Sequence, residues 1–205
     1  MIQAEHITKT YGQRTIIKDI NIELHQGELV CLLGVSGSGK TTLFHILSGL
    51  TTPDEGHVYL NDRDITSTPG QISYMLQKDL LLPHKKIIDN VSLPLILKGM
   101  KKTEAISSIN KWAKELKVEE YLQMPAEKLS KGNQQKIQFM TAIIHNPELV
   151  VLDEPFSGLD PVNTEILKNI IIDLIKNGKY IIMSAHQMAT IEEFCSDILI
   201  LNKGK

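Results

Sequence analysis

The sequence predicts an α/β fold with a mainly parallel core sheet and helices on both faces, and two observations support this. Short, continuous apolar runs recur along the chain at 29–33, 149–152 and 180–184. Runs of this kind are typical of parallel strands that are covered on both sides. Segments with a helical spacing of apolar residues follow several of these runs, as expected where helices connect parallel strands.

The bulk properties are those of an ordinary globular domain. The chain has 205 residues and a formal net charge of −2, and this length suits one α/β domain with an inserted subdomain. The longest basic runs are the pairs Lys85-Lys86 and Lys101-Lys102, so we expect no binding to nucleic acid. Cys31 and Cys195 lack the spacing of metal ligands and are interpreted as structural thiols in a reducing compartment.

No apolar stretch approaches the length of a membrane span, and the N-terminus lacks the layout of a signal peptide. We therefore expect a cytoplasmic protein that reaches a membrane only through a partner.

Strands are predicted first in the N-terminal third of the chain. Loose alternation predicts strands over 2–10 and 16–24, and two shorter runs, 57–60 and 72–76, predict two more. Between them, 42–49 has helical spacing.

The pattern changes from 79 to 125, which we interpret as a mostly helical inserted subdomain. Thr103 to Lys117 has helical periodicity, with Thr103 as the expected N-cap. Leu80-Leu81-Leu82-Pro83 is an apolar cluster at the start of a loop. It predicts either a docking surface or packing onto the core.

The C-terminal half alternates helices and strands. Helices are expected at 132–145 and 162–177, and a last strand at 198–201. The chain stops at Lys205, directly after a turn, so we expect a trimmed or short C-terminus.

The most specific motif is the segment from Gly34 to Thr41, which fits the phosphate-loop pattern and follows the apolar run 29–33. Its glycines let backbone N–H groups approach an anion, and the helix that follows adds a partial positive charge. Lys40 supplies a positive charge to the outer phosphates, and the Thr41 hydroxyl suits Mg²⁺. The residues expected to hold the phosphates are Gly34, Ser36, Gly37, Ser38, Gly39, Lys40, Thr41 and Thr42.

Polar side chains at strand ends predict the catalytic groups. Asp153 ends a buried run and resembles the Walker B aspartate, which would hold Mg²⁺ through water. Glu154 is placed to polarise a water that attacks the γ-phosphate. Gln77 can offer an amide oxygen to Mg²⁺ and its water, and His186 can hydrogen-bond the γ-phosphate or the attacking water.

Taken together, these motifs resemble the nucleotide-binding subunit of ABC transporters over essentially all 205 residues. The matches are Tyr11 for the aromatic residue that stacks on adenine, Gly34 to Thr41 for Walker A, Gln77 for the Q-loop, Leu129 to Asn133 for the signature, Asp153-Glu154 for Walker B, Ser157 to Asp160 for the D-loop and His186 for the H-loop.

The resemblance implies a P-loop NTPase fold with an N-terminal antiparallel β subdomain and an inserted α-helical subdomain. The whole chain, 1–205, would form one ATPase domain that uses ATP and Mg²⁺. Its α/β core and β subdomain would comprise 1–78 and 147–205, and its helical subdomain, with the signature, 79–146.

The resemblance also implies partners. Two such subunits pair head to tail, as a homodimer or a heterodimer, so that Ser130 and Gly132 of one chain close over ATP held by the other. Asp160 of the D-loop would lie near the nucleotide. A separate transmembrane permease would hold the subunit on the cytoplasmic face of the membrane.

The sequence departs from the family pattern at Lys131 and Asn133 of the signature and at Gln187. Residues 77–83 with 89–91 look like importers of the nitrate, sulfonate and taurine group, whereas 129–136 look like exporters. The permease docks near the former segment, so import is favoured over export. A mosaic or engineered cassette and a soluble ABC-type ATPase that acts on ribosomes or DNA are the alternatives.

Overall fold

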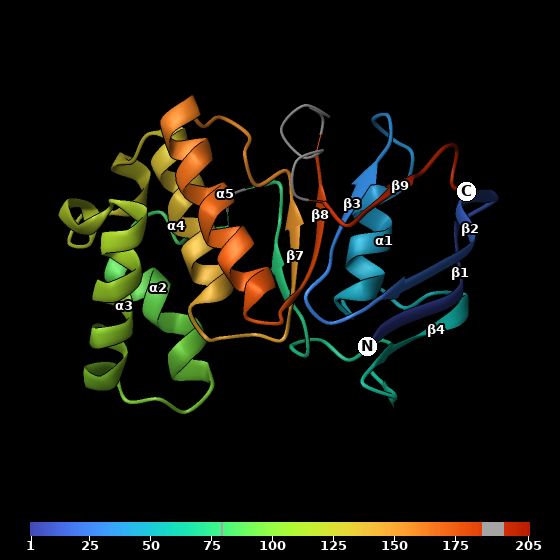
Figure 1. The fold of residues 1–205 in the computed structure, drawn as a ribbon, viewed down its shortest axis with the longest axis horizontal. Coiled ribbons are helices and arrows are strands. Elements are labelled where there is room, and N and C mark those ends of the chain that lie inside the picture. The colour runs from blue at the N-terminus through green and yellow to red at the C-terminus, as the bar shows by residue number, and fades with distance from the viewer. Residues whose placement is uncertain (79, 186–194) are drawn as a thin grey trace. The chain divides into compact units, whose positions relative to one another are not determined.

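The computed structural model describes residues 1–78, 80–185 and 195–205 (Figure 1). His186 therefore lies outside the described residues. The chain divides into two compact units. The sheet unit comprises Met1–Tyr74, Glu148–Glu154 and Asp173–Lys205, and the helical unit comprises Met75–Pro147 and Pro155–Ile172.

An antiparallel sheet forms the N-terminal part of the sheet unit. Its strand order is β2-β1-β4-β5. Ile2 and Ala4 of β1 are buried and alternate with more exposed residues, and a register shift between Ala4 and Ile7 brings Ile7 to the core as well, so one face of the sheet is covered. Its strands are β1 (Ile2–Tyr11), β2 (Arg14–Leu24), β4 (Glu55–Leu60) and β5 (Arg63–Asp64).

A second sheet carries the buried runs of the sequence, in the order β6-β7-β8-β3-β9. The pairs β7–β8, β8–β3 and β3–β9 are parallel. Every residue of β3, β7 and β8 is buried, so the predicted α/β fold with a mainly parallel core sheet is confirmed. The strands are β3 (Leu29–Leu33), β6 (Ser73–Met75), β7 (Leu149–Asp153), β8 (Tyr180–Ser184) and β9 (Asp197–Ile200).

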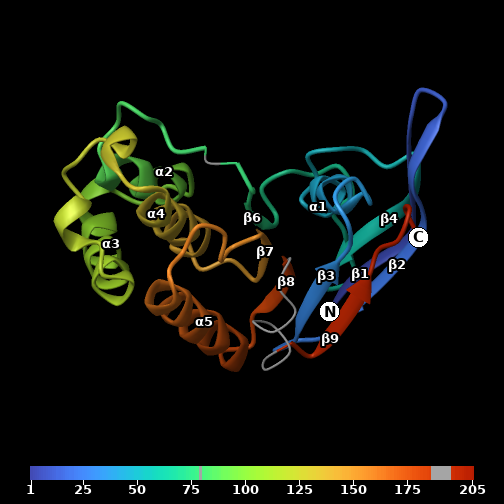
Figure 2. The same cartoon turned by 90° about the horizontal axis from the view of Figure 1, so that it is seen from above.

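Helix α1 (Lys40–Leu47) joins the two sheets of the sheet unit into one core. Its buried Leu43, Phe44 and Ile46 belong to a single cluster with Ile17 of β2 and Val30 of β3. Figure 2 shows α1 beside β3 and β4. Burial of aliphatic and aromatic side chains on several sides holds the start of α1 in place.

The helical unit is built around α2 (Ile87–Leu97), α3 (Lys102–Leu116) and α4 (Lys131–Ile143), which contact one another. The expected N-cap at Thr103 is wrong, because α3 begins at Lys102 and Lys101 is its N-cap. Helix α2 contains Pro94 and was not predicted individually. The remaining elements are α5 (Pro161–Lys176) and the 3₁₀ helices η1 (Glu119–Tyr121) and η2 (Ala126–Lys128).

Among the described residues, the structure contains no helix with the length and apolar character needed to cross a bilayer.

The close approach of β4 to β1 generates a stability prediction at Gly56. Gly56 has φ +90°, and a Cβ there would overlap the carbonyl oxygen of Glu5. We expect Gly56→Ala to lower the free energy of unfolding by about 2–4 kcal/mol, because backbone strain and a steric clash both raise the free energy of the folded state. Urea denaturation followed by circular dichroism measures this change.

Gly70→Ala is the matched control. Gly70 has a similar φ of +86°, but a Cβ there meets no described atom within 4 Å. Its cost should be about 1 kcal/mol, from backbone strain alone. Equal losses of stability in the two variants would contradict the clash at Gly56.

Candidate functional site

The phosphate loop connects β3 to α1 within the sheet unit. Gly39 is the N-cap of α1 with φ 110°, a left-handed conformation, and no described side chain caps this helix end. The first N–H groups of a helix without a side-chain cap are free to bind an anion. The structure therefore places Gly37, Ser38, Gly39, Lys40 and Thr41 at a helix N-terminus, as the motif predicted.

Two glycines of the loop are fixed by close packing. A Cβ on Gly34 would lie 2.5 Å from the Ser38 Oγ and 2.6 Å from the Leu201 carbonyl oxygen, and a Cβ on Gly39 would lie 2.6 Å from Ile17 Cγ2. Neither position has room for a larger residue. The loop is thus held close to β2 and to the residue after β9.

Two buried polar groups of the loop fit a phosphate ligand. The Ser38 Oγ is buried and has no hydrogen-bond partner among the residues that the structure describes. The Lys40 ammonium, also buried, donates to the carbonyl oxygens of Gly34 (2.5 Å) and Val35 (3.3 Å) of the same loop. A buried hydroxyl without a partner costs free energy, and a phosphate oxygen is an acceptor that would satisfy it.

The Asp153 carboxylate lies at the end of β7 and is buried. Its Oδ1 accepts a hydrogen bond from the Ser184 hydroxyl at 2.6 Å, and its Oδ2 accepts one from the Tyr74 hydroxyl at 3.5 Å. Burial raises the pKa of this carboxyl, whereas the Ser184 hydrogen bond and the charge of Lys40 lower it. Ser184 of β8 pairs with Asp153 of β7 on one side and with Leu32 of β3 on the other, and the phosphate loop begins two residues after Leu32.

Glu154 follows Asp153 in a left-handed conformation, with φ 55°. This conformation costs a non-glycine residue about 1–2 kcal/mol. The Glu154 N–H donates to the Ser184 Oγ at 3.0 Å. The Ser184 hydroxyl thus joins both carboxylate residues, since it donates to Asp153 and accepts from Glu154.

This donor set suits Mg²⁺. Mg²⁺ is commonly held by one or two carboxylates together with substrate phosphates and waters. Asp153 and Thr41 are oxygen-bearing residues of the sheet unit that could serve as such ligands, and Gln77 is an exposed residue of the helical unit. Within the described ranges, no cluster of three or more His, Cys, Asp or Glu side chains could hold a metal ion.

Tyr11 ends β1 and is 52% exposed. The Lys9 ammonium lies 5.5 Å from the centre of its ring and pairs with Asp54 at 2.7 Å. Lys9 thus lies over one side of the ring, while the residue as a whole remains exposed. Ser36 and Thr41 are exposed and Thr42 is half-buried.

The signature residues begin α4 in the helical unit. Ser130 is the N-cap, and its Oγ accepts from the Asn133 N–H at 3.3 Å. This contact uses the oxygen and leaves the hydroxyl proton for another acceptor. A Cβ on Gly132 would lie 3.3 Å from the Gly158 carbonyl oxygen, so the signature and the D-loop are in close contact.

Asp160 precedes α5 and binds the start of that helix. Its carboxylate accepts from the Asn163 N–H at 3.0 Å and from the Asn163 Nδ2 at 2.5 Å. The hydrogen bonds from Asn163 hold the pKa of this carboxyl below its usual value. Asp160 thus acts as a helix cap.

Sequence reasoning did not identify Ser184. It is the last residue of an otherwise apolar buried run, and the parallel register pairs it with Asp153. A buried hydroxyl at the end of the strand next to the Walker B strand was the available signal. Its partner was not deducible, because strand order is not written in the sequence.

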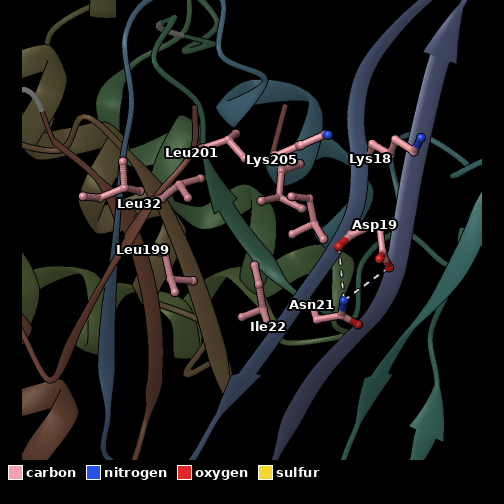
Figure 3. A pocket seen from close by; sticks show the side chains of 11 residues that line it. Lys18, Asp19, Asn21, Ile22, Leu32, Leu199, Leu201 and Lys205 are labelled. Carbon is pink, nitrogen blue, oxygen red and sulfur yellow. Dashed lines mark hydrogen bonds between the residues drawn. The ribbon is translucent and has the colours of Figure 1, made fainter. Parts of the chain in front are cut away.

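The sheet unit also contains a cavity of about 410 Å³ (Figure 3). Aliphatic side chains such as Leu32, Leu199 and Leu201 line it, with Lys18 and Asp19 among its polar residues. The lining set contains no predicted nucleotide-binding residue among those described. This cavity is therefore not the phosphate site.

Comparisons with known proteins agree with the geometry. A family model described as ABC transporter matches residues 17–157. An uncharacterized ABC transporter ATP-binding protein of Methanocaldococcus jannaschii is 43% identical over 204 residues, which cover 100% of this chain and 75% of that protein. A second such protein, of Bacillus subtilis, is 40% identical over 206 residues, covering 100% of this chain and 69% of the other.

A solved structure gives the same result. This chain resembles a dimeric post-hydrolysis state of an ATP-binding cassette bound to ADP and Pi, with a TM-score of 0.91 and 28% identity. The match covers 100% of this chain and 95% of that one.

The Ser184 hydroxyl generates a prediction about stability. Ser184→Ala removes a donor to Asp153 and an acceptor for Glu154 in a fully buried position. We expect the free energy of unfolding to fall by about 1–3 kcal/mol, because two buried polar groups lose a partner. Urea denaturation near neutral pH measures it.

Ser48→Ala is the control for the same change at another buried serine. The Ser48 hydroxyl donates to the carbonyls of Phe44 and His45, which both keep backbone N–H donors. Its cost should stay below about 1 kcal/mol. If Ser184→Ala were no more costly than this control, the bridging role of Ser184 would be wrong.

Proposed function

The chain belongs to the ABC transporter family as an ATP-hydrolysing cassette, and on this basis we propose that it is the subunit that powers a separate membrane permease. It binds MgATP at the phosphate loop, pairs with a second nucleotide-binding subunit and hydrolyses the γ-phosphate. The single observation that carries the proposal is the phosphate loop itself. Its buried Ser38 hydroxyl has no partner among the described residues, and its buried Lys40 ammonium has only loop carbonyls.

Binding would use groups that are already in place. The phosphates accept hydrogen bonds from the uncapped N–H groups at the start of α1 and from Ser38. The Lys40 ammonium moves from the carbonyls of Gly34 and Val35 to phosphate oxygens. Tyr11, exposed at the end of β1, stacks on the adenine.

Hydrolysis would depend on the residues at the end of β7. When bound, Mg²⁺ neutralises charge on the β- and γ-phosphates, and Asp153, Thr41 and Gln77 are the residues that would hold it. The Glu154 carboxylate accepts a hydrogen bond from a water and orients it toward the γ-phosphorus. The bond from the water oxygen to the γ-phosphorus forms as the bond from that phosphorus to the departing ADP oxygen breaks, and the proton of the water passes to the Glu154 carboxylate. His186, which lies outside the described residues, is proposed to hydrogen-bond the γ-phosphate.

A complete site would need a second subunit. Ser130 and Gly132 at the start of α4 would close over ATP bound to the partner, since a helix N-terminus with small residues is an anion site. The similar cassette solved with ADP and Pi is dimeric, which supports this pairing. In this arrangement the 205 residues act as one ATPase domain, with its core in 1–78 and 147–205 and its helical part in 79–146.

We propose import as the direction of transport. The segment from Gln77 to Pro83 and the residues 89–91 resemble importers of the nitrate, sulfonate and taurine group, and this is the part of the family fold where the permease docks. The signature segment 129–136 resembles exporters, and export is therefore the second candidate. A mosaic cassette that joins two such parts would explain both resemblances.

The permease would contact an apolar surface of the helical unit. Leu80 and Leu82 are 61% and 47% exposed in the loop before α2. Large apolar side chains exposed close together in the chain are typical of a protein interface. A soluble ABC-type ATPase would have no need of this surface, so membrane association separates the two functions.

Glu154→Gln tests the catalytic assignment. The amide keeps the size of the side chain but is a poor acceptor for a proton from water, so we expect kcat to fall about 10²–10⁴-fold. ATP binding should persist, and an ATP-bound dimer should accumulate because its hydrolysis is blocked. Phosphate release and sedimentation velocity measure the two effects.

Glu148→Gln is the control at the other end of β7. Glu148 is exposed and accepts a hydrogen bond only from Asn61 among the side-chain bonds described there. Its phosphate release should match that of the parent chain. An undiminished rate of ATP hydrolysis in Glu154→Gln would contradict the catalytic assignment of Glu154.

Leu80→Asp combined with Leu82→Asp tests the docking surface. Two buried carboxylates at an apolar interface should cost at least about tenfold in affinity for the permease, while ATP hydrolysis by the free subunit stays unchanged. Co-purification with the permease from detergent-solubilised membranes measures the loss. Leu50→Asp is the control, because Leu50 is 55% exposed but belongs to the sheet unit. Undiminished capture of the double variant would rule out this surface.

A further inference from the structure

A buried glutamine on α4 holds the backbone on both sides of Gln77. The Nε2 of Gln138 donates to the carbonyl oxygen of Leu76 at 2.7 Å and to that of Lys78 at 3.3 Å. Gln138 is 7% exposed, and all of these residues belong to the helical unit. One amide group therefore fixes the residues immediately before and after Gln77.

The orientation of this amide follows from electrostatics. Rotating it by 180° would place Oε1 against two carbonyl oxygens, so the amino group must face Leu76 and Lys78. In this orientation the Oε1 of Gln138 is buried without a hydrogen-bond partner in the described part of the chain. The side chain thus leaves its own acceptor unsatisfied while it binds two backbone carbonyls.

The surroundings of Gln138 show that this link is more than local helix packing. Gln135, one turn earlier on α4, donates through Nε2 to the carbonyl oxygen of Pro155 at 3.1 Å. Pro155 directly follows Glu154 in the chain. Two buried amides three residues apart on one helix face therefore bind the backbone next to two predicted catalytic residues.

We propose that Gln138 is a positioning residue, which sets the location of the Gln77 side chain by holding the carbonyls of Leu76 and Lys78. This inference rests on the proposed function, in which Gln77 contacts Mg²⁺ and its water. Gln77 itself is exposed and lies in a bend outside any strand, so the regular hydrogen bonds of β6 do not fix it. The two hydrogen bonds from Gln138 hold the backbone on either side of Gln77 instead. They link this segment to α4, the helix that begins with the signature residues.

Gln138→Met tests the link. Methionine keeps an unbranched side chain of similar length but donates no hydrogen bond. Hydrogen exchange of the full-length chain should become at least about tenfold faster in the segment 75–78, because this backbone loses its anchor. The value of kcat for ATP hydrolysis should fall about tenfold with little change in the KM for ATP, since a misplaced catalytic group affects turnover more than binding.

Two further variants sharpen the result. Gln138→Asn is the second variant to use if the methionine variant folds poorly. It keeps an amide on a side chain that is one methylene shorter, so we expect smaller changes in hydrogen exchange at 75–78 and in kcat. Thr141→Val is the matched control on the same helix, because the Thr141 hydroxyl donates only within α4, to the carbonyl of Ile137 at 2.8 Å. The control should leave exchange at 75–78 and kcat unchanged.

Faster hydrogen exchange confined to 75–78, together with a fall in kcat at a nearly unchanged KM for ATP, supports the positioning role. Unchanged exchange at 75–78, exchange that is faster throughout the chain, or unchanged kcat despite faster local exchange would each overturn it. If the parent chain itself hydrolysed no ATP, the proposed function would fail, and hydrogen exchange alone would still decide whether Gln138 holds this segment.

Discussion

Parallel pairing of β7, β8 and β3 brings the groups of the candidate site together. Because parallel strands present their carboxyl ends at one edge of a sheet, the register places Ser184 opposite both Asp153 and Leu32. The phosphate loop begins at Gly34, shortly after Leu32. A buried serine hydroxyl and a buried carboxylate thus lie at the edge of the sheet from which the phosphate loop, with its buried Lys40 ammonium, leads into α1.

The buried charged groups near this edge have hydrogen-bond partners within the chain. Lys40 donates to carbonyls of its own loop, and Asp153 is held by hydroxyls from Ser184 and Tyr74. These neutral carbonyl and hydroxyl partners limit the cost of burying charge. The Ser38 hydroxyl has no such substitute among the described residues.

In the helical unit, side chains of α4 hold backbone segments that belong to no helix or strand. Gln135 and Gln138 of α4 bind the carbonyls of Pro155, Leu76 and Lys78. Buried backbone carbonyls outside regular structure require such partners. A helix that begins with the signature residues therefore also supports the segments next to Gln77 and Glu154, and its position and theirs are linked by hydrogen bonds rather than by apolar packing alone.

The strands, the phosphate loop and the family could be predicted from the amino-acid order alone, because buried apolar runs and the Gly34 to Thr41 pattern are local features of the chain. The same reasoning misplaced the start of α3 at Thr103 and did not identify α2, since helix ends and a proline inside a helix depend on tertiary packing. The bridge from Ser184 to Asp153 and Glu154, and the two bonds from Gln138 on either side of Gln77, became visible only in the folded chain. These contacts connect residues far apart in the chain, and strand order and helix packing, which bring them together, are not encoded in any local pattern.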